Sequence, residues 1–376
     1  MSMNAAVENY LMPGGGANII ALPKVSLHDH LDGGLRPQTI VELADEIGYE
    51  VPERDPAKLT SWFADHADSG SLVNYLKTFD VTIAVMQTTE GLHRVAREFV
   101  QDLADDGVIY GEIRWAPEQH LQSGLDLDQV VNAVQEGLEA GVDSVRASGR
   151  SIRVGQLLSS MRQTDRSTDI AELAIRHRDR GVLGFDSAGP EAGFPASMYR
   201  EAYDLLAHNY LPATVHAGEA DGLESIRSAL FDGRALRLGH GVRLAEDITI
   251  AREDDENTYV SLGDLAQWVK DREIALELSP SSNLQTGAIE QWGDEMVDHP
   301  FDLLYQLGFR VTVNTDNRLM SATTLSRELF LLSEAFSYDL TDLEVFQINA
   351  ASAAFLPIEE REELSEAISA GFESVQ

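Results

Sequence analysis

The chain of 376 residues contains no cysteine. Disulfide bonds and zinc sites with thiolate ligands are therefore excluded. No apolar run approaches the roughly 18 to 20 residues that a membrane-spanning helix requires. Residues 1–21 also carry no basic segment followed by a long apolar core. We therefore expect a soluble, cytoplasmic protein.

Basic residues are scarce as well. The sequence has 28 lysines and arginines against 63 aspartates and glutamates, which gives a formal net charge of -35. A field of this sign repels nucleic acids and anionic membranes, so we expect neither of them as a partner. The same charge is consistent with adaptation to salt and with simple solubility, and the sequence does not separate the two.

Short apolar segments alternate with helical ones, such as 92–104 and 127–141, without a long linker. The predicted strands cover residues 24–30, 108–115, 152–158, 182–186, 213–216, 237–240, 274–278 and 309–314. Eight strands interleaved with helices predict an α/β fold, the (β/α)8 TIM barrel, whose active site lies at the carboxyl ends of the strands. We expect residues 1–376 to form a single barrel domain, with additional helices after strand 1 and at the C-terminus.

The segment after the first predicted strand is rich in large apolar side chains. Ser71 is suited to cap a helix in which Leu72, Tyr75, Leu76 and Phe79 fall on one face. Such a stripe belongs either to the core or, at this place in a barrel, to the cover of an active-site mouth.

Two acidic segments interrupt the alternation. Residues 246–259 contain the run Glu253-Asp254-Asp255-Glu256-Asn257 and are predicted to form a solvated loop. Residues 358–376 are predicted to be an acidic helical tail, to which we assign no function.

His28 and His30 lie two residues apart at the end of the first apolar segment. Alternate residues of a strand share a face, so both imidazoles can point at one atom. Imidazole is the commonest protein ligand for zinc, and a catalytic zinc needs further ligands from distant parts of the sequence. By itself, the pair also fits a strand end with two polar residues beside a loop.

Further polar residues fall at or near the carboxyl ends of predicted strands: Arg114, Asp186, His216, His240, Glu277 and Asp316. Together with His28 and His30, His216 and Asp316 make a nitrogen and oxygen shell for zinc that leaves one place for water. His240 is then available to orient or deprotonate that water. Glu219 follows His216 by three residues, after a glycine that permits a tight turn, and is available as a proton donor.

We assign no chemical role to the other polar residues. Arg114, Asp186 and Glu277 are interpreted as ion-pairing groups that support the ligands rather than as reacting groups. The histidines without motif context are interpreted as surface or packing residues: His93, His120, His177, His208 and His299.

Seven short motifs occur along nearly the whole chain after the first twenty residues. They are His28-Asp29-His30-Leu31-Asp32-Gly33, Ser71-Leu72 with Phe79, Asp186-Ser187-Ala188-Gly189-Pro190-Glu191, His216-Ala217-Gly218-Glu219, Gly239-His240-Gly241, Ser279-Pro280-Ser281-Ser282-Asn283 with Thr286-Gly287, and Asn314-Thr315-Asp316. Each motif is weak alone, but together and in this order they resemble the adenosine deaminase family of the metal-dependent amidohydrolase superfamily.

The resemblance implies roles for individual residues. The ligands of one zinc ion (Zn2+) per chain would be His28, His30, His216 and Asp316. Glu219 would protonate purine N1, and His240 would assist the attacking water together with Asp316.

The resemblance also implies the substrate contacts. The backbone N–H of Gly189 would bond to purine N3, and Asp32 would reach the ribose, with His30 beside it. The apolar lid over the nucleoside would be formed by Leu72, Tyr75, Leu76 and Phe79.

One position departs from the family pattern. The family commonly has a second aspartate after the zinc-binding one, hydrogen-bonded to purine N7, where this chain has Asn317. Because N7 only accepts, a carboxylate must be protonated to bond to it, whereas an amide donates without that requirement. We therefore expect Asn317 to keep the N7 contact. Pro190, beside Gly189, is a smaller departure that concerns the shape of that loop.

The implied reaction is hydrolytic deamination of adenosine and 2′-deoxyadenosine to inosine and deoxyinosine plus ammonia, a step of purine salvage. The expected partner is a small-molecule purine nucleoside, and the oligomeric state is left open. A related deaminase acting on adenine or on a modified adenosine is the nearest alternative, although relatives that prefer the free base often carry Glu where this chain has Asp32.

Two further alternatives fit the sequence less well. A phosphotriesterase-like hydrolase usually bridges two metals with a modified lysine, and no lysine lies at the carboxyl end of a predicted strand. A non-catalytic purine-binding or secreted signalling protein disagrees with the complete set from His28 to Asp316. Turnover of adenosine and adenine, together with zinc content, separates these functions.

Overall fold

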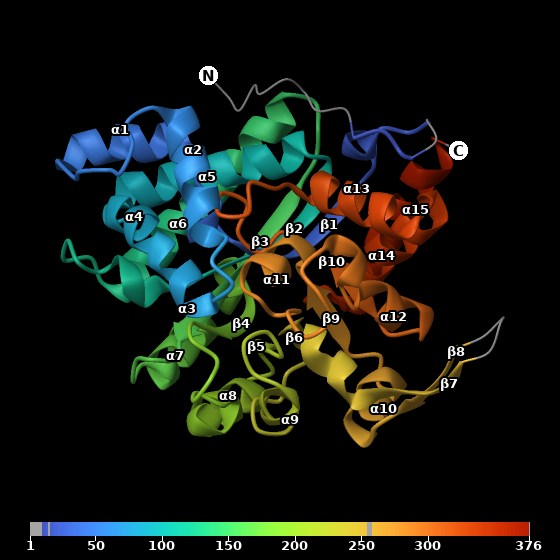
Figure 1. Ribbon diagram of the computed structural model, residues 1–376. Coiled ribbons are helices and arrows are strands. Elements are labelled where there is room, and N and C mark those ends of the chain that lie inside the picture. Colours follow the sequence, from blue (N-terminus) through green and yellow to red (C-terminus); the bar gives the residue numbers. More distant parts are fainter. Residues whose placement is uncertain (1–9, 14–15, 254–257, 376) are drawn as a thin grey trace.

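Eight parallel strands form the centre of the molecule (Figure 1). The computed structural model describes residues 10–13, 16–253 and 258–375. The central strands are β1 (Lys24–His30), β2 (Val108–Trp115), β3 (Arg153–Met161), β4 (Val182–Ala188), β5 (Thr214–Ala217), β6 (Arg237–His240), β9 (Ala275–Leu278) and β10 (Val311–Val313). Nearly all of their residues are buried, as is usual for parallel strands that are covered on both faces.

Two four-stranded sheets close into a barrel. One sheet has the order β1-β2-β3-β4, and the other has the order β5-β6-β9-β10. Parallel bridges connect Phe185 to Ala213 at one seam and Asp29 to Asp316 at the other. This ring confirms the predicted (β/α)8 TIM barrel, and each predicted strand overlaps one of its strands.

Helices surround the barrel (Figure 1). They are α1 (Pro37–Ile47), α2 (Pro56–Ala67), α3 (Leu72–Tyr75), α4 (Phe79–Val85), α5 (Thr89–Asp105), α6 (Leu127–Ala147), α7 (Ser167–His177), α8 (Arg200–His208), α9 (Leu223–Phe231), α10 (Asp264–Asp271), α11 (Pro280–Gln285), α12 (Phe301–Gln306), α13 (Leu325–Phe336), α14 (Leu340–Ala353) and α15 (Ile358–Glu373). Helices α5 and α6 pack against each other and against β2 and β3, so the apolar core lies between the barrel wall and the helices. In the part of the chain that the structure describes, no helix has both the length and the apolar character needed to cross a membrane.

The cover that follows β1 is not the single helix that the sequence predicts. The chain instead forms α3, a 3-10 turn over Leu76–Thr78, and α4. The Thr78 hydroxyl donates to the carbonyl oxygen of Tyr75 at 2.7 Å, and a threonine that bonds its local backbone competes with regular helix. Ser71 occupies the predicted N-cap position of α3, but its side chain makes no capping hydrogen bond.

The acidic insertion likewise differs from the predicted loop over 246–259. A 3-10 turn at Val242–Asp247 leads into an antiparallel hairpin of β7 (Ile248–Glu253) and β8 (Thr258–Leu262), which projects from the barrel (Figure 1). β-Branched residues such as Ile248, Thr249 and Ile250 favour strands, whereas the predicted loop was based on the acidic composition of the segment. Most of the acidic run, residues 254–257, lies outside the described residues. The predicted helical tail is present as α15.

Candidate active site

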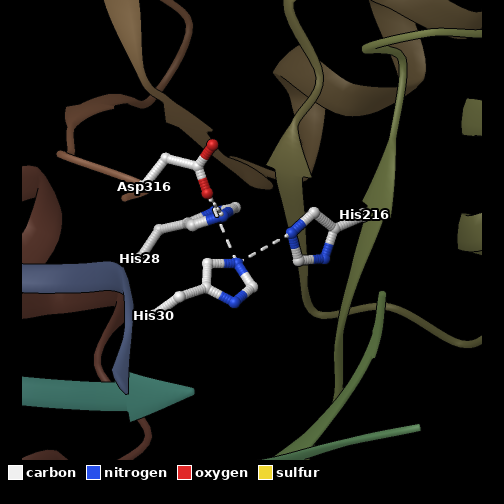
Figure 2. A group of neighbouring side chains, drawn as sticks. All are labelled: His28, His30, His216 and Asp316. Atoms are coloured by element: carbon white, nitrogen blue, oxygen red, sulfur yellow. Dashed lines mark hydrogen bonds and ion pairs between the residues drawn. The ribbon is translucent and has the colours of Figure 1, made fainter. Parts of the chain in front are cut away.

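Three histidines and one aspartate converge at the carboxyl end of the barrel (Figure 2). His28 and His30 come from β1, His216 comes from β5, and Asp316 follows β10. Hydrogen bonds between β1 and the segment after β10 fix this placement: the backbone N–H of His30 donates to the Asp316 oxygen at 2.8 Å, and that of Asp316 donates to the His28 oxygen at 3.0 Å. The structure thus brings together all four residues that the sequence suggests as metal ligands.

The distances within this cluster fit a small divalent metal ion. The Nε2 atom of His30 lies 3.3 Å from His216 Nε2 and 3.3 Å from Asp316 Oδ1, and Asp316 Oδ1 lies 3.3 Å from His28 Nε2. A tetrahedral ion with bonds of about 2.0 to 2.1 Å requires its ligand atoms to be about 3.3 Å apart. The buried Nε2 of His28 has no hydrogen-bond partner among the described residues. These residues therefore form a candidate metal site with nitrogen and oxygen ligands.

Carboxylates behind two of the histidines orient the rings. His28 Nδ1 lies 3.1 Å from Glu277 Oε2, and His216 Nδ1 lies 2.9 Å from Asp186 Oδ1. An imidazole that donates through Nδ1 leaves its Nε2 lone pair free for a metal ion. Arg114 completes the arrangement, with Nη2 2.7 Å from Glu277 and Nη1 3.7 Å from Asp186. The prediction that these three groups form supporting ion pairs is confirmed.

Glu277 stays ionised although it is fully buried. Burial alone would raise its pKa, but the guanidinium groups of Arg114 and Arg237 hold the pKa of this carboxyl well below its usual range. Arg237 Nε lies 2.6 Å from Glu277 Oε1, and Arg237 also pairs with Glu112 at 2.5 Å. A permanently charged acceptor therefore stands behind His28.

Glu219 and His240 face each other beside the cluster. Their closest atoms, Glu219 Oε2 and His240 Nε2, are 3.6 Å apart, and the exposed fractions of the two residues are 4% and 1%. Burial and the negative charges of Asp316 and Glu191 raise the pKa of Glu219 well above its usual value. Glu219 Oε1 has no hydrogen-bond partner among the described residues. The carboxyl is thus placed to hold a proton and to meet a polar atom of a ligand.

Backbone strain accompanies two of these groups. His240 and Asp316 have φ angles of 66° and 57°, in the left-handed region that non-glycine residues rarely adopt. Such strain persists only where the surrounding structure imposes it, and it is concentrated at functional sites.

No role is predicted for Glu191, the last residue of one of the motifs. Its buried carboxylate accepts hydrogen bonds from four consecutive backbone N–H groups, those of Gly218, Glu219, Ala220 and Asp221, at 2.6 to 3.1 Å. It also accepts from the Ser225 hydroxyl at 2.5 Å. Glu191 therefore fixes the turn that carries Glu219. Its position in a motif was the only signal, because backbone partners leave no pattern in the sequence.

Arg162 is a second residue without a predicted role. Only 3% of it is exposed, and its guanidinium donates to the backbone oxygen of His216. It follows β3 directly, but the predicted strand ends at residue 158, four residues earlier, so no strand-end role is predicted for this arginine.

A cavity opens from the cluster towards the cover formed by α3 and α4. It is lined by all of the predicted contact residues: His30, Asp32, Leu72, Tyr75, Leu76, Phe79, Gly189 and Asn317. His216, Glu219, His240 and Asp316 also line it. Further lining residues without a predicted role are Asp80, Ile83, Ala116, Gln119, Ser159, Met161, Gln163 and Ala188.

Two lining residues have polar groups that bear on a ligand. Tyr75 is 1% exposed, and its hydroxyl lies 3.4 Å from the Ser321 hydroxyl. It therefore contributes a polar group as well as apolar surface to the cover. Asn317 is 3% exposed, and its buried Oδ1 has no partner among the described residues. Gly33 makes room for this amide, because a Cβ at Gly33 would lie 2.0 Å from Asn317 Oδ1.

The sequence is similar to known proteins over most of its length. A family model described as "Adenosine deaminase" matches residues 23–371. The protein named Adenosine deaminase 1 of Streptomyces coelicolor is 55% identical over 340 residues, which are 90% of this chain and 84% of that protein.

Solved structures share the fold. The N6-mAMP deaminase of Arabidopsis has a TM-score of 0.77 at 26% identity, and the match covers 94% of this chain and 99% of that one. An amidohydrolase from Burkholderia ambifaria with bound Zn has a TM-score of 0.79 at 21% identity, and the match covers 98% of this chain and 97% of that one.

The pair of His216 and Asp186 yields a test of the metal site. We expect Asp186→Asn to weaken binding of zinc to the metal-free protein by about 10- to 100-fold, because the amide no longer fixes the imidazole as a metal ligand. Titration calorimetry with a competing chelator measures the affinity. Asp128→Asn is the matched control, since Asp128 also bonds a histidine, His177, at 2.6 Å, but outside the cluster. Equal affinities of Asp186→Asn and the unmodified protein would contradict the assignment.

Proposed function

This chain belongs to the adenosine deaminase family, a family of hydrolytic enzymes, and we propose that it converts adenosine and 2′-deoxyadenosine to inosine and deoxyinosine plus ammonia, in purine salvage, with one zinc ion per chain. The observation that carries the proposal is the placement of Glu219. Its buried carboxyl, with one oxygen unpartnered among the described residues, shares a cavity with the His/Asp cluster. A protonated carboxyl beside a metal site is what the attack of water on an aminopurine requires.

A metal ion held by His28, His30, His216 and Asp316 would act as a Lewis acid that makes water nucleophilic near neutral pH. Side chains of the protein supply the remaining chemistry. The ring carbon C6 of a purine is open to attack only when N1 accepts a proton, and Glu219 donates it. The tetrahedral adduct at C6 then loses ammonia and leaves the 6-oxopurine.

Other groups orient the substrate in this proposal. His240, 3.6 Å from Glu219, orients the attacking water together with Asp316. The backbone N–H of Gly189 donates to N3, and the amide of Asn317 donates to N7. Asp32 accepts from the ribose, and α3 and α4 exclude water from the base, which strengthens each of these polar contacts.

The charge of the cavity supports a nucleoside over a nucleotide. Asp32 and Asp80 are among its lining residues, and no lysine or arginine is among those that the structure describes there. A 5′-phosphate would meet these carboxylates without the cationic partner that phosphate recognition uses. Adenine itself would leave Asp32 without a ribose hydroxyl to bind.

We test the substrate by the loss of near-ultraviolet absorbance on addition of the purified protein, with the metal content measured on the same sample. We expect adenosine and 2′-deoxyadenosine to be converted, with about one zinc per chain, and a chelator to abolish the conversion. Preference for adenine or AMP would contradict the proposed substrate. A protein that binds purines without converting any of them would contradict the enzymatic function.

Glu219→Gln tests the proton donor. The amide keeps the size of the side chain but has no acidic proton, so we expect kcat for adenosine to fall by about 10²-fold or more, with zinc content and substrate affinity retained. Steady-state kinetics and binding of the product inosine measure the two effects. Near-normal turnover would remove Glu219 from this role.

Asn317→Ala tests the contact with N7. One lost hydrogen bond of about 1 to 1.5 kcal/mol predicts a decrease of about 5- to 15-fold in kcat/KM for adenosine. The matched substrate is 7-deazaadenosine, which has no N7 acceptor and should lose much less with the same variant. Unchanged KM and kcat for adenosine would show that Asn317 does not bind N7.

A further inference from the structure

A line of buried polar side chains extends from His240 away from the cavity. Asn283 lies on α11, and His299 follows the 3-10 turn Met296–Asp298. The amide nitrogen of Asn283 is 2.9 Å from His240 Nδ1, and its Oδ1 is 3.2 Å from His299 Nε2. The exposed fractions of His240, Asn283 and His299 are 1%, 0% and 2%.

The backbone at the far end determines the direction of these hydrogen bonds. The N–H of Phe301 can only donate, and it lies 3.0 Å from Nδ1 of His299, so this nitrogen must accept. Burial lowers the pKa of His299 to about 3, so the ring is neutral and carries its proton on Nε2. His299 therefore donates to the Oδ1 atom of Asn283.

The same logic continues to the active site. With its oxygen engaged by His299, the amide of Asn283 presents an N–H to Nδ1 of His240, which must accept. If the amide of Asn283 were reversed, its N–H would face the Nε2–H of His299. The proton of His299 cannot move to Nδ1, because Nδ1 accepts the hydrogen bond from the N–H of Phe301. A neutral His240 therefore carries its proton on Nε2, the atom that faces Glu219.

We propose that Asn283 and His299 are positioning residues that hold His240 with a proton on Nε2, so that His240 serves the attacking oxygen as a hydrogen-bond donor and not as a base. The part of this inference that concerns the attacking oxygen rests on the proposed function. The interpretation of His299 as a surface or packing residue is thereby replaced by a role that acts through His240. A similar arrangement, in which a buried partner fixes the tautomer of a catalytic histidine, governs other enzymes.

The tautomer can be measured without any reaction. Protein loaded with zinc and labelled with 15N at histidine is examined by two-bond 1H–15N correlation NMR, without substrate, and the His240 signals are assigned by their absence in His240→Gln. We expect a protonated Nε2 and a bare Nδ1. A proton on Nδ1 of His240 would overturn the proposal. A protein that shows the expected pattern but does not convert adenosine would support this inference and contradict the proposed function.

Asn283→Asp tests the consequence for catalysis. A carboxylate only accepts, so it draws the proton of His240 to Nδ1 and leaves Nε2 bare. We expect the NMR pattern to invert and kcat to fall by up to about 10⁴-fold, the loss known for a catalytic histidine held in the wrong tautomer. KM should change by less than about 3-fold, because ground-state binding is not affected. An inverted pattern with an unchanged kcat would overturn the role assigned to His240.

His299→Gln and His299→Leu form a matched pair. Glutamine can still donate to Asn283, whereas leucine cannot, so we expect only His299→Leu to mix the tautomers of His240 and to lose about 10- to 100-fold in kcat. Thermal stability and zinc content are measured on both variants. Equal losses of kcat in both, with the tautomer of His240 unchanged, would show a merely structural role and overturn the proposal.

Discussion

The pairing of buried charges inside the barrel is the constraint on which the site depends. Four carboxylates and two guanidinium groups lie there almost without exposure: Glu112, Asp186, Glu277, Asp316, Arg114 and Arg237. Charges in a protein interior are tolerated only when they are compensated. Glu277 connects the system, because it contacts both guanidinium groups and His28.

A second group of residues decides what each candidate reacting group can do. Glu277 and Asp186 direct the Nε2 atoms of His28 and His216 towards the metal position. Glu191 fixes the turn that presents Glu219, and Asn283 contacts the rear of His240. In each case a hydrogen bond on the far side of a side chain leaves a defined atom facing the cavity. Groups oriented in this way need no rearrangement when a substrate binds, and this preorganisation accounts for a large part of catalysis in enzymes of this kind.

The sequence predicted the barrel and the strand-end residues, and the structure brings together His28, His30, His216 and Asp316 as expected. Two predictions of local structure were wrong because other local preferences of the chain prevailed over the predicted element. Thr78 bonds to the local backbone where the helix predicted through Phe79 tightens into a 3-10 turn. β-Branched residues form a hairpin in a segment whose acidic composition favoured a loop. The supporting residues were missed for another reason. Glu191 and His299 act through backbone groups and through other side chains, and such contacts follow no spacing rule.

The alternation of eight strands with helices, and the histidines and carboxylates at the strand ends, can be read from the sequence alone. Hydrophobic periodicity is a local property of the chain, and barrel sites lie at the carboxyl ends of strands, so neither inference needs knowledge of tertiary contacts. Which atom of each side chain faces the cavity depends on the folded arrangement of its neighbours. A histidine has two nitrogens, and the one that stays free depends on the partner of the other. For His28 this partner is Glu277, 249 residues away, and for His240 it is Asn283, itself oriented by His299 and Phe301. The direction of a hydrogen bond is a property of the assembled neighbourhood, so no local stretch of sequence contains it.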